Sequence, residues 1–216
     1  MGKIQNEKET ALKVASDLLQ IEAIKLSVEN PFTWSSGWKS PIYCDNRLSL
    51  SYPEIRTYIK EQLSEAAKAL FPGYEAVAGV ATAGIPQGAL LAEALGVPFI
   101  YVRSKSKGHG MTNLIEGKVT PGQKVIVVED LVSTGGSSLK AAADLRASGF
   151  EILGMVAIFT YGFPVADENF ANANIQLHTL SNYSVMLEKA KELGYVKESD
   201  LASLEEWRKD PSSWRR

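Results

Sequence analysis

The chain has 216 residues, of which 45% are hydrophobic and 22% are charged, and its formal net charge is −2 at pH 7. A chain of this length can form one well-filled hydrophobic core, but it is short for two full domains. The near-neutral charge excludes a general nucleic-acid coat protein, which needs a basic surface to displace counterions from phosphates.

Cysteine and histidine usage narrows the class of protein further. The single cysteine, Cys44, excludes an internal disulfide framework and is expected to be a small buried hydrophobe in a strand. The two histidines argue against a histidine-rich metal site. Residues 1–10 lack the apolar centre of an export signal, and no apolar run is long enough to cross a bilayer. These features predict a soluble, cytoplasmic protein without a membrane or nucleic-acid partner.

The N-terminal part of the chain predicts a helix, a turn-rich stretch and a second helix. The first helix is marked by apolar residues at helical spacing, namely Ala11, Val14, Ala15, Leu18 and Leu19. Residues 30–41 are rich in Asn, Ser, Gly and Pro and lead into a short strand at 42–44. The second helix is expected over 53–70, ending before Pro72-Gly73.

Short apolar runs then alternate with helical stretches. The runs cover residues 76–81, 98–102, 124–128 and 152–159, and helices are expected over 87–95 and 137–147. Strands that are apolar on both faces and separated by helices are typical of a parallel sheet that is covered on both sides.

Two regions do not follow this alternation. Residues 104–120 are polar and glycine-rich, with too weak a pattern for the core. Beyond Gly162 the chain turns polar, and two helices are then expected. One carries Met186, Ala190 and Leu193 on one face, and the other covers residues 200–208.

The most informative segment follows the third apolar run and reads Glu129-Asp130-Leu131-Val132-Ser133-Thr134-Gly135-Gly136-Ser137-Ser138. A buried strand delivers two adjacent acids to its carboxyl end, and a Ser/Thr/Gly turn then opens a helix. Such a turn points backbone N–H groups into one concavity, where the helix N-terminus adds partial positive charge. The sequence therefore predicts a cradle for a phosphomonoester.

The two acids indicate what carries that phosphate. Glu129 and Asp130 stand just before the turn, where they suit the cis-hydroxyls of a ribose whose 5′-phosphate lies in the cradle. A purely structural role would hold two acids against a buried strand, which is costly without a polar partner. The segment has neither the Gly-Lys-Ser/Thr of a P-loop nor the spacing of a dinucleotide-binding motif.

Three motifs resemble known families. Residues 125–138 resemble the phosphoribosyl pyrophosphate (PRPP) motif of type I phosphoribosyltransferases, which purine, uracil and orotate enzymes share. Residues 32–45 are similar to the hood loop of orotate phosphoribosyltransferases, with its Phe-Thr-x-x-Ser-Gly-x-x-Ser-Pro pattern. Residues 103–110 are similar to that family's mobile catalytic loop, Arg-x-x-x-Lys-x-His-Gly. The resemblance covers about residues 10–165.

The resemblance implies an α/β protein of the type I phosphoribosyltransferase fold, with a mostly parallel central sheet flanked by helices. Residues 1–216 would form one domain, with a hood mainly in 1–50, a core in about 51–165 and a C-terminal helical extension in about 166–216. The implied enzyme transfers the 5-phosphoribosyl group from PRPP to orotate. It gives orotidine 5′-monophosphate and pyrophosphate in de novo pyrimidine (UMP) biosynthesis. Mg²⁺ is the implied cofactor, bound mainly through PRPP and with no protein ligand assigned.

The resemblance also implies the site residues. Catalytic roles fall on Lys107, His109 and Asp130, and Ser133 is expected to contact orotate as well. Thr82-Ala83-Gly84 would present backbone N–H groups to pyrophosphate. A homodimer is implied, in which the 104–120 loop acts on the neighbouring subunit. The implied PRPP contacts are Arg103, Lys107, His109, Glu129, Asp130, Leu131, Val132, Ser133, Thr134, Gly135, Gly136 and Ser137.

The chain departs from some relatives at positions that are cationic there, namely Ser35, Ala83, Ser104 and Tyr161. These departures leave open how the orotate carboxylate is held, and Lys39 and Lys105 are the candidates to compensate. The aromatic residues Phe32, Trp34 and Trp38 are expected to pack or to form dimer contacts, not to stack on a base.

Two other functions are compatible with part of the sequence. A phosphoribosyltransferase for another base, such as a purine, would share residues 129–137 but not the hood pattern. A regulator that senses PRPP while binding DNA or RNA would need a basic stripe or an added helical module. This near-neutral chain has room for neither.

Overall fold

A six-stranded sheet forms the centre of the protein, which we describe from a computed structural model covering residues 4, 6–34, 37–104 and 114–215. The strand order is β10-β9-β8-β5-β6-β7, and all pairs are parallel except the antiparallel pair β6–β7. The strands are β5 (Ala76–Val80), β6 (Phe99–Val102), β7 (Ile115–Glu116), β8 (Lys124–Val132), β9 (Glu151–Thr160) and β10 (Leu177–Asn182).

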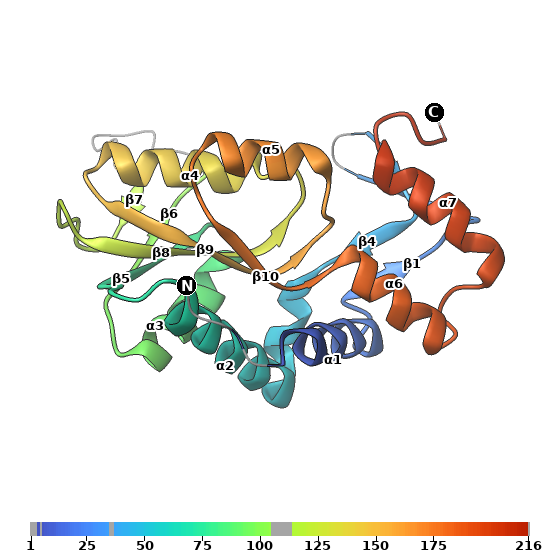
Figure 1. Cartoon of the computed structure of the whole chain (residues 1–216), viewed down its shortest axis with the longest axis horizontal. Coiled ribbons are helices and arrows are strands. Elements are labelled where there is room, and N and C mark those ends of the chain that lie inside the picture. The colour runs from blue at the N-terminus through green and yellow to red at the C-terminus, as the bar shows by residue number, and fades with distance from the viewer. Residues whose placement is uncertain (1–3, 5, 35–36, 105–113, 216) are drawn as a thin grey trace.

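Helices cover both faces of this sheet (Figure 1). One face carries α4 (Gly136–Ala147) and α5 (Pro164–Asn172), and the other carries α1 (Glu7–Gln20), α2 (Pro53–Leu70) and α3 (Gly84–Leu95). This arrangement explains why the central strands are apolar on both faces. Alternate residues of β8 enter different clusters: Ile126 and Val128 pack toward Leu18 and Leu63, and Val125 and Val127 pack toward Leu145 and Phe170.

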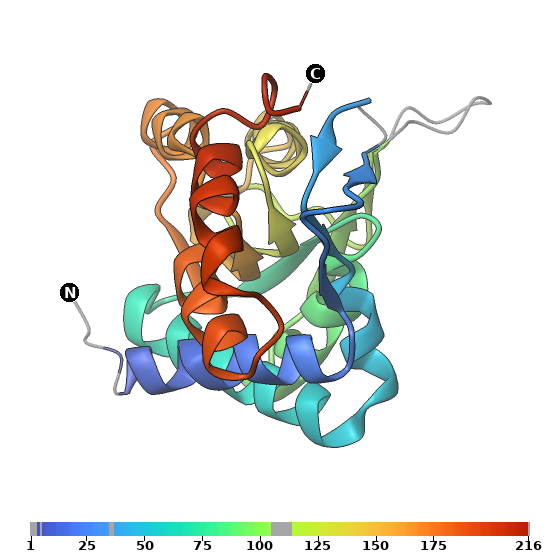
Figure 2. The same cartoon turned by 90° about the vertical axis from the view of Figure 1, so that its right-hand side faces the viewer.

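The N-terminal and C-terminal segments meet beside the sheet. Figure 2 shows α7 (Glu198–Lys209) standing next to the short strands of the N-terminal region. These strands form two antiparallel pairs, β1 (Ile24–Leu26) with β4 (Ile42–Cys44) and β2 (Phe32–Thr33) with β3 (Lys39–Ser40). A 3₁₀ helix, η1 (Asn46–Ser51), follows β4, and α6 (Tyr183–Glu192) precedes α7.

Aromatic side chains pack between the N-terminal region, the end of β9 and α7. Trp207 of α7 is fully buried, and its ring centroid lies 5.6 Å from Trp34 and 5.7 Å from Tyr161 at the end of β9. Trp34 and Tyr161 are themselves 5.2 Å apart. The prediction that Trp34 is a packing residue is therefore confirmed.

The predicted fold class is confirmed, and the helix predicted over 53–70 is found as α2. Several expectations were wrong in detail. The third helix begins at Gly84 and not at residue 87, because it continues the turn after β5. Strand β10 and helix α5 lie in the polar stretch beyond Gly162, where no sheet strand was predicted. Ile115, inside the segment expected to avoid the core, is 6% exposed and belongs to β7.

No helix in the described part of the chain is both long and apolar enough to cross a membrane.

Candidate active site

The carboxyl end of β8 holds the two adjacent acids in a network of hydrogen bonds. Glu129 is 6% exposed, and its carboxylate accepts from the Asp130 backbone N–H at 3.0 Å and from the Ser138 hydroxyl at 3.0 Å. Ser138 lies in the first turn of α4, so this contact ties the helix to the strand. The polar partners needed by a buried acid are thus present for Glu129.

Burial is the main electrostatic influence on both acids. It raises the pKa of Glu129, and the neighbouring Asp130 raises it further, while the Ser138 hydroxyl opposes the shift. Burial also raises the pKa of Asp130, against hydrogen bonds from its surroundings and the positive charge of Arg47. A pair of this kind favours ligands that donate hydrogen bonds or carry positive charge. Ribose hydroxyls meet the first condition.

The turn after β8 combines hydroxyl side chains with a left-handed glycine and leads directly into α4. The Ser133 hydroxyl accepts a hydrogen bond from the Thr134 N–H at 2.6 Å, and α4 begins at Gly136. Gly135 has φ +80°, and a Cβ there would lie 2.7 Å from the Phe170 ring. Glycine at this position is therefore required both by the left-handed backbone and by the close neighbour.

The Thr82–Gly84 turn lies against the same end of the sheet. A Cβ on Gly84 would lie 2.5 Å from the backbone oxygen of Val128, and the Ala81–Thr82 peptide bond is cis. The absence of a side chain at Gly84 lets the turn approach the backbone just before Glu129. The structure thus brings Gly84, the last residue of this turn, close to the backbone of Glu129.

The predicted catalytic loop is only partly described. Arg103 directly follows β6, and its guanidinium lies 3.4 Å from the Glu116 carboxylate of β7. Ser104 is exposed at the start of the loop. Lys105, Lys107 and His109 lie outside the described residues, as does Ser35 of the hood loop.

A hollow beside the turn after β8 is lined by residues from four segments of the chain. Its volume is about 320 Å³, and its lining includes Thr134 of the turn, Trp38, Phe163 and Arg208 of α7. The adjacent end of β9 is apolar, because Tyr161 is 3% exposed and its ring lies 5.5 Å from that of Phe163. Lys39 is exposed, and its amino group donates to the Thr33 hydroxyl at 2.8 Å.

Sequence reasoning missed three residues that support this site. Asn46 donates from its side chain to the backbone oxygen of Asp130 at 2.8 Å, and Asn169 of α5 does the same to Thr134 at 3.0 Å. Arg47 places a positive charge near Asp130. No local pattern marks these residues, because each acts through a contact made only in the folded chain. Ser138 stood within the PRPP motif, yet its bond to Glu129 was not foreseen.

Among the described residues, no group of three or more His, Cys, Asp and Glu side chains is placed to hold a metal ion. Glu129 and Asp130 are hard oxygen ligands of the type that Mg²⁺ prefers, and their carboxylates fit a metal whose remaining ligands come from a substrate.

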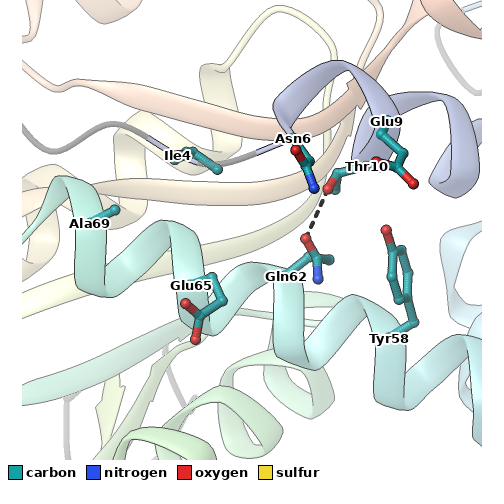
Figure 3. A pocket seen from close by; sticks show the side chains of 8 residues that line it. All are labelled: Ile4, Asn6, Glu9, Thr10, Tyr58, Gln62, Glu65 and Ala69. Atoms are coloured by element: carbon teal, nitrogen blue, oxygen red, sulfur yellow. Dashed lines mark hydrogen bonds between the residues drawn. The ribbon is translucent and has the colours of Figure 1, made fainter.

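Another surface cavity lies between α1 and α2 (Figure 3). It has a volume of about 480 Å³ and is crossed by a 2.8 Å hydrogen bond from Thr10 to Gln62. Glu9, Glu65 and Tyr58 give it a polar, acidic wall. None of the predicted site residues lines it, so the candidate active site remains at the carboxyl end of β8.

Comparisons with known proteins decide the family. The model of the phosphoribosyl transferase domain matches residues 50–169. An orotate phosphoribosyltransferase of Cytophaga hutchinsonii is 58% identical over 204 residues, which are 94% of this chain and 98% of that protein. The chain belongs to the orotate phosphoribosyltransferase family.

Solved structures agree with this family assignment. The orotate phosphoribosyltransferase of Aeropyrum pernix has a TM-score of 0.74 at 30% identity, covering 85% of this chain and 99% of that one. The fold also matches the UMP synthase of Leishmania donovani, with a TM-score of 0.77 at 23% identity. This chain covers 43% of that protein. The expectation of a type I phosphoribosyltransferase fold is confirmed.

Proposed function

We propose that this protein transfers the 5-phosphoribosyl group from PRPP to orotate. The products are orotidine 5′-monophosphate and pyrophosphate, in the pathway that makes UMP. The observation that carries the proposal is the pair Glu129 and Asp130, placed near the end of β8 and two residues before the Ser133–Gly136 turn. Family membership over nearly the whole chain supports the choice of orotate over other bases.

We assign the roles of the site residues from this geometry. Backbone N–H groups of the Ser133–Ser137 turn bind the 5′-phosphate, aided by the hydroxyls of Ser133, Thr134 and Ser137. Glu129 and Asp130 accept hydrogen bonds from the ribose hydroxyls, and Leu131 and Val132 carry the chain from the acids to the turn. The negative charge of Asp130 stabilises the oxocarbenium-like transition state. Ser133 also contacts orotate.

The pyrophosphate side of the site is assigned to other segments. Backbone N–H groups of Thr82, Ala83 and Gly84 bind the pyrophosphate. Arg103, Lys107 and His109 neutralise or donate to its oxygens as negative charge develops there. Mg²⁺, bound mainly through PRPP, would offset part of the same charge. Reaction proceeds when these groups close around the anomeric carbon and exclude water.

The assembly and location follow from the same proposal. We propose a homodimer in which the 104–120 loop of one subunit serves the site of the other. Strand β6 ends just before this loop and β7 lies within it, and both strands stand at one edge of the sheet, which supports a loop that reaches a neighbouring subunit. We further propose a cytoplasmic location, because the charged substrate PRPP does not pass through a lipid bilayer unaided.

The division of the chain is also a proposal. We treat residues 1–216 as a single domain, with a hood mainly in 1–50, a core in about 51–165 and a C-terminal extension in about 166–216. The main hydrophobic cluster supports a single unit, because it contains Ile24, Val128 and Trp207, one from each of these parts.

The proposed function is tested by base choice. The protein is incubated with PRPP, Mg²⁺ and either orotate, uracil, adenine or hypoxanthine, and base absorbance is followed. Orotate should be consumed and the others should not, because a site built around a carboxylate leaves polar groups unpaired when the carboxylate is absent. Comparable turnover of uracil or a purine would contradict the assignment.

A further inference from the structure

The side chain of Asn46 joins the N-terminal region to the residue that carries the proposed catalytic carboxylate. Asn46 is the first residue of η1, directly after Asp45, and is 1% exposed. A fully buried asparagine in a short surface helix is unusual, since burying a polar amide is costly unless it is hydrogen-bonded. Its partners therefore indicate why it is there.

Both ends of the Asn46 amide are occupied. Its Nδ2 donates to the backbone oxygen of Asp130 at 2.8 Å, and its Oδ1 accepts from the Cys44 thiol at 3.2 Å. The backbone oxygen of Asn46 accepts from the Ser49 hydroxyl at 2.6 Å. A side chain at this position must therefore both donate and accept a hydrogen bond. Asparagine does both, whereas an ionised aspartate cannot donate and alanine can do neither.

The contact from Asn46 reaches β8 at a point where the strand has a pairing neighbour on one side only. The neighbouring strand β5 pairs with β8 only as far as Gly79 and Val128. The last residues of β8, which include Glu129 and Asp130, extend beyond that pairing and have a ladder partner only in β9. The bond from Asn46 supports this projecting end from a separate segment of the chain.

We propose that Asn46 is a positioning residue for phosphoribosyl transfer, which holds the backbone of Asp130 so that its carboxylate meets the ribose in the reactive geometry. The inference rests on the proposed function and on the role of Asp130 in it. Because β4 runs directly into η1, the same contact fixes the N-terminal hood strands relative to the ribose site. Displacements near one ångström at a reacting centre cost up to about 100-fold in rate.

The test is a double-mutant cycle on Asn46→Ala and Asp130→Asn, read as the single-turnover rate at saturating PRPP, Mg²⁺ and orotate. Asn46→Ala alone should lower this rate by about 10- to 100-fold and leave both KM values within about threefold. In the Asp130→Asn background the same change should cost less than about twofold, because the carboxylate that it positions is already gone.

Ser49→Ala is the matched control. Ser49 is equally buried and hydrogen-bonds within η1, yet its side chain does not reach β8. It should leave the single-turnover rate unchanged within about twofold, since it breaks a bond of the same segment without touching Asp130. A loss equal to that of Asn46→Ala would show that only the folding of η1 matters and would overturn the proposal.

Two further results bear on the proposal. Asn46→Asp keeps the side-chain shape and loses the donor. It is measured in parallel in case the alanine variant does not fold. Like Asn46→Ala, it should lower the rate strongly when Asp130 is present and only slightly in the Asp130→Asn background. Equal losses from the Asn46 changes in both Asp130 backgrounds would overturn the positioning role while leaving the proposed function intact. A normal rate for Asp130→Asn alone would overturn both the positioning role of Asn46 and the role assigned to Asp130, whereas the proposed function itself would fail only if the wild-type protein did not consume orotate.

Discussion

Replacing Asp130 with Asn removes one negative charge and preserves the size of the side chain. The proposed transition state carries positive charge on the ribose, so activity should fall by about two to three orders of magnitude. Burial raises the pKa of Asp130, which means that the fold disfavours its charged form, so the neutral variant should keep its stability near neutral pH. Steady-state kinetics and thermal unfolding measure the two effects. Loss of stability in step with activity would point to a structural role.

Gly135 offers a test of the phosphate turn with an internal control. Gly135 and Gly122 have similar positive φ angles, +80° and +83°, but a Cβ meets Phe170 only at Gly135 and open space at Gly122. Alanine at either position should cost about 1–2 kcal/mol of stability through the left-handed backbone, and Gly135→Ala should cost more than Gly122→Ala because its Cβ also meets Phe170. Only Gly135→Ala should also raise the KM for PRPP, by tenfold or more on the scale of about 1.4 kcal/mol per factor of ten. Equal KM values in both variants would contradict a role of the turn in PRPP binding.

At the scale of helices and strands, α7 should be essential to the fold. Its Trp207 is fully buried against the aromatic rings of Trp34, which follows β2, and Tyr161, which follows β9. Trp207→Ala should lower the free energy of unfolding by about 3–5 kcal/mol, as for other large buried aromatics. The control is Tyr195→Ala, at a side chain that is 49% exposed, which should change stability by less than about 0.5 kcal/mol. Urea unfolding followed by circular dichroism compares the two, and similar small losses would show that α7 is dispensable.

The sequence predicted those elements whose structure is decided locally. Strand β8 is a continuous apolar run, its turn carries glycines and hydroxyls, and α2 has clear ends, so each could be located from neighbouring residues. Strand β10 could not, because its burial pattern arises from packing between β9 and α1 and its sequence is mixed in polarity. The roles of Asn46 and Asn169 could not be predicted either, because their hydrogen-bond partners Asp130 and Thr134 are distant in the sequence. Ile115 was assigned to a loop because two residues of strand are too few to show a period.

For the whole molecule, the arrangement of subunits is the main prediction. Lys107→Ala and Asp130→Asn are prepared as separate, nearly inactive proteins and their subunits are exchanged. If the loop of one subunit serves the other, each heterodimer has one site with both changes and one intact site. A statistical mixture is about half heterodimer, so about a quarter of the wild-type activity should return. No recovery in a mixture shown to exchange subunits would mean that the loop acts within its own subunit.

Because Trp34 and Trp207 are in contact, the intrinsic tryptophan fluorescence of the protein can be used to follow movements of the N-terminal strands relative to α7. The chain has four tryptophans, of which Trp34 and Trp38 lie in the N-terminal region and Trp207 and Trp214 near the C-terminus. The indole rings of Trp34 and Trp207 are 5.6 Å apart, close enough to exchange excitation energy, and Trp207 is fully buried, so its emission is expected at shorter wavelengths than that of an exposed tryptophan. A substrate that moves the N-terminal strands relative to α7 would therefore change the intrinsic fluorescence without any attached dye. Binding to the active site could then be timed in a stopped-flow instrument on the unmodified protein.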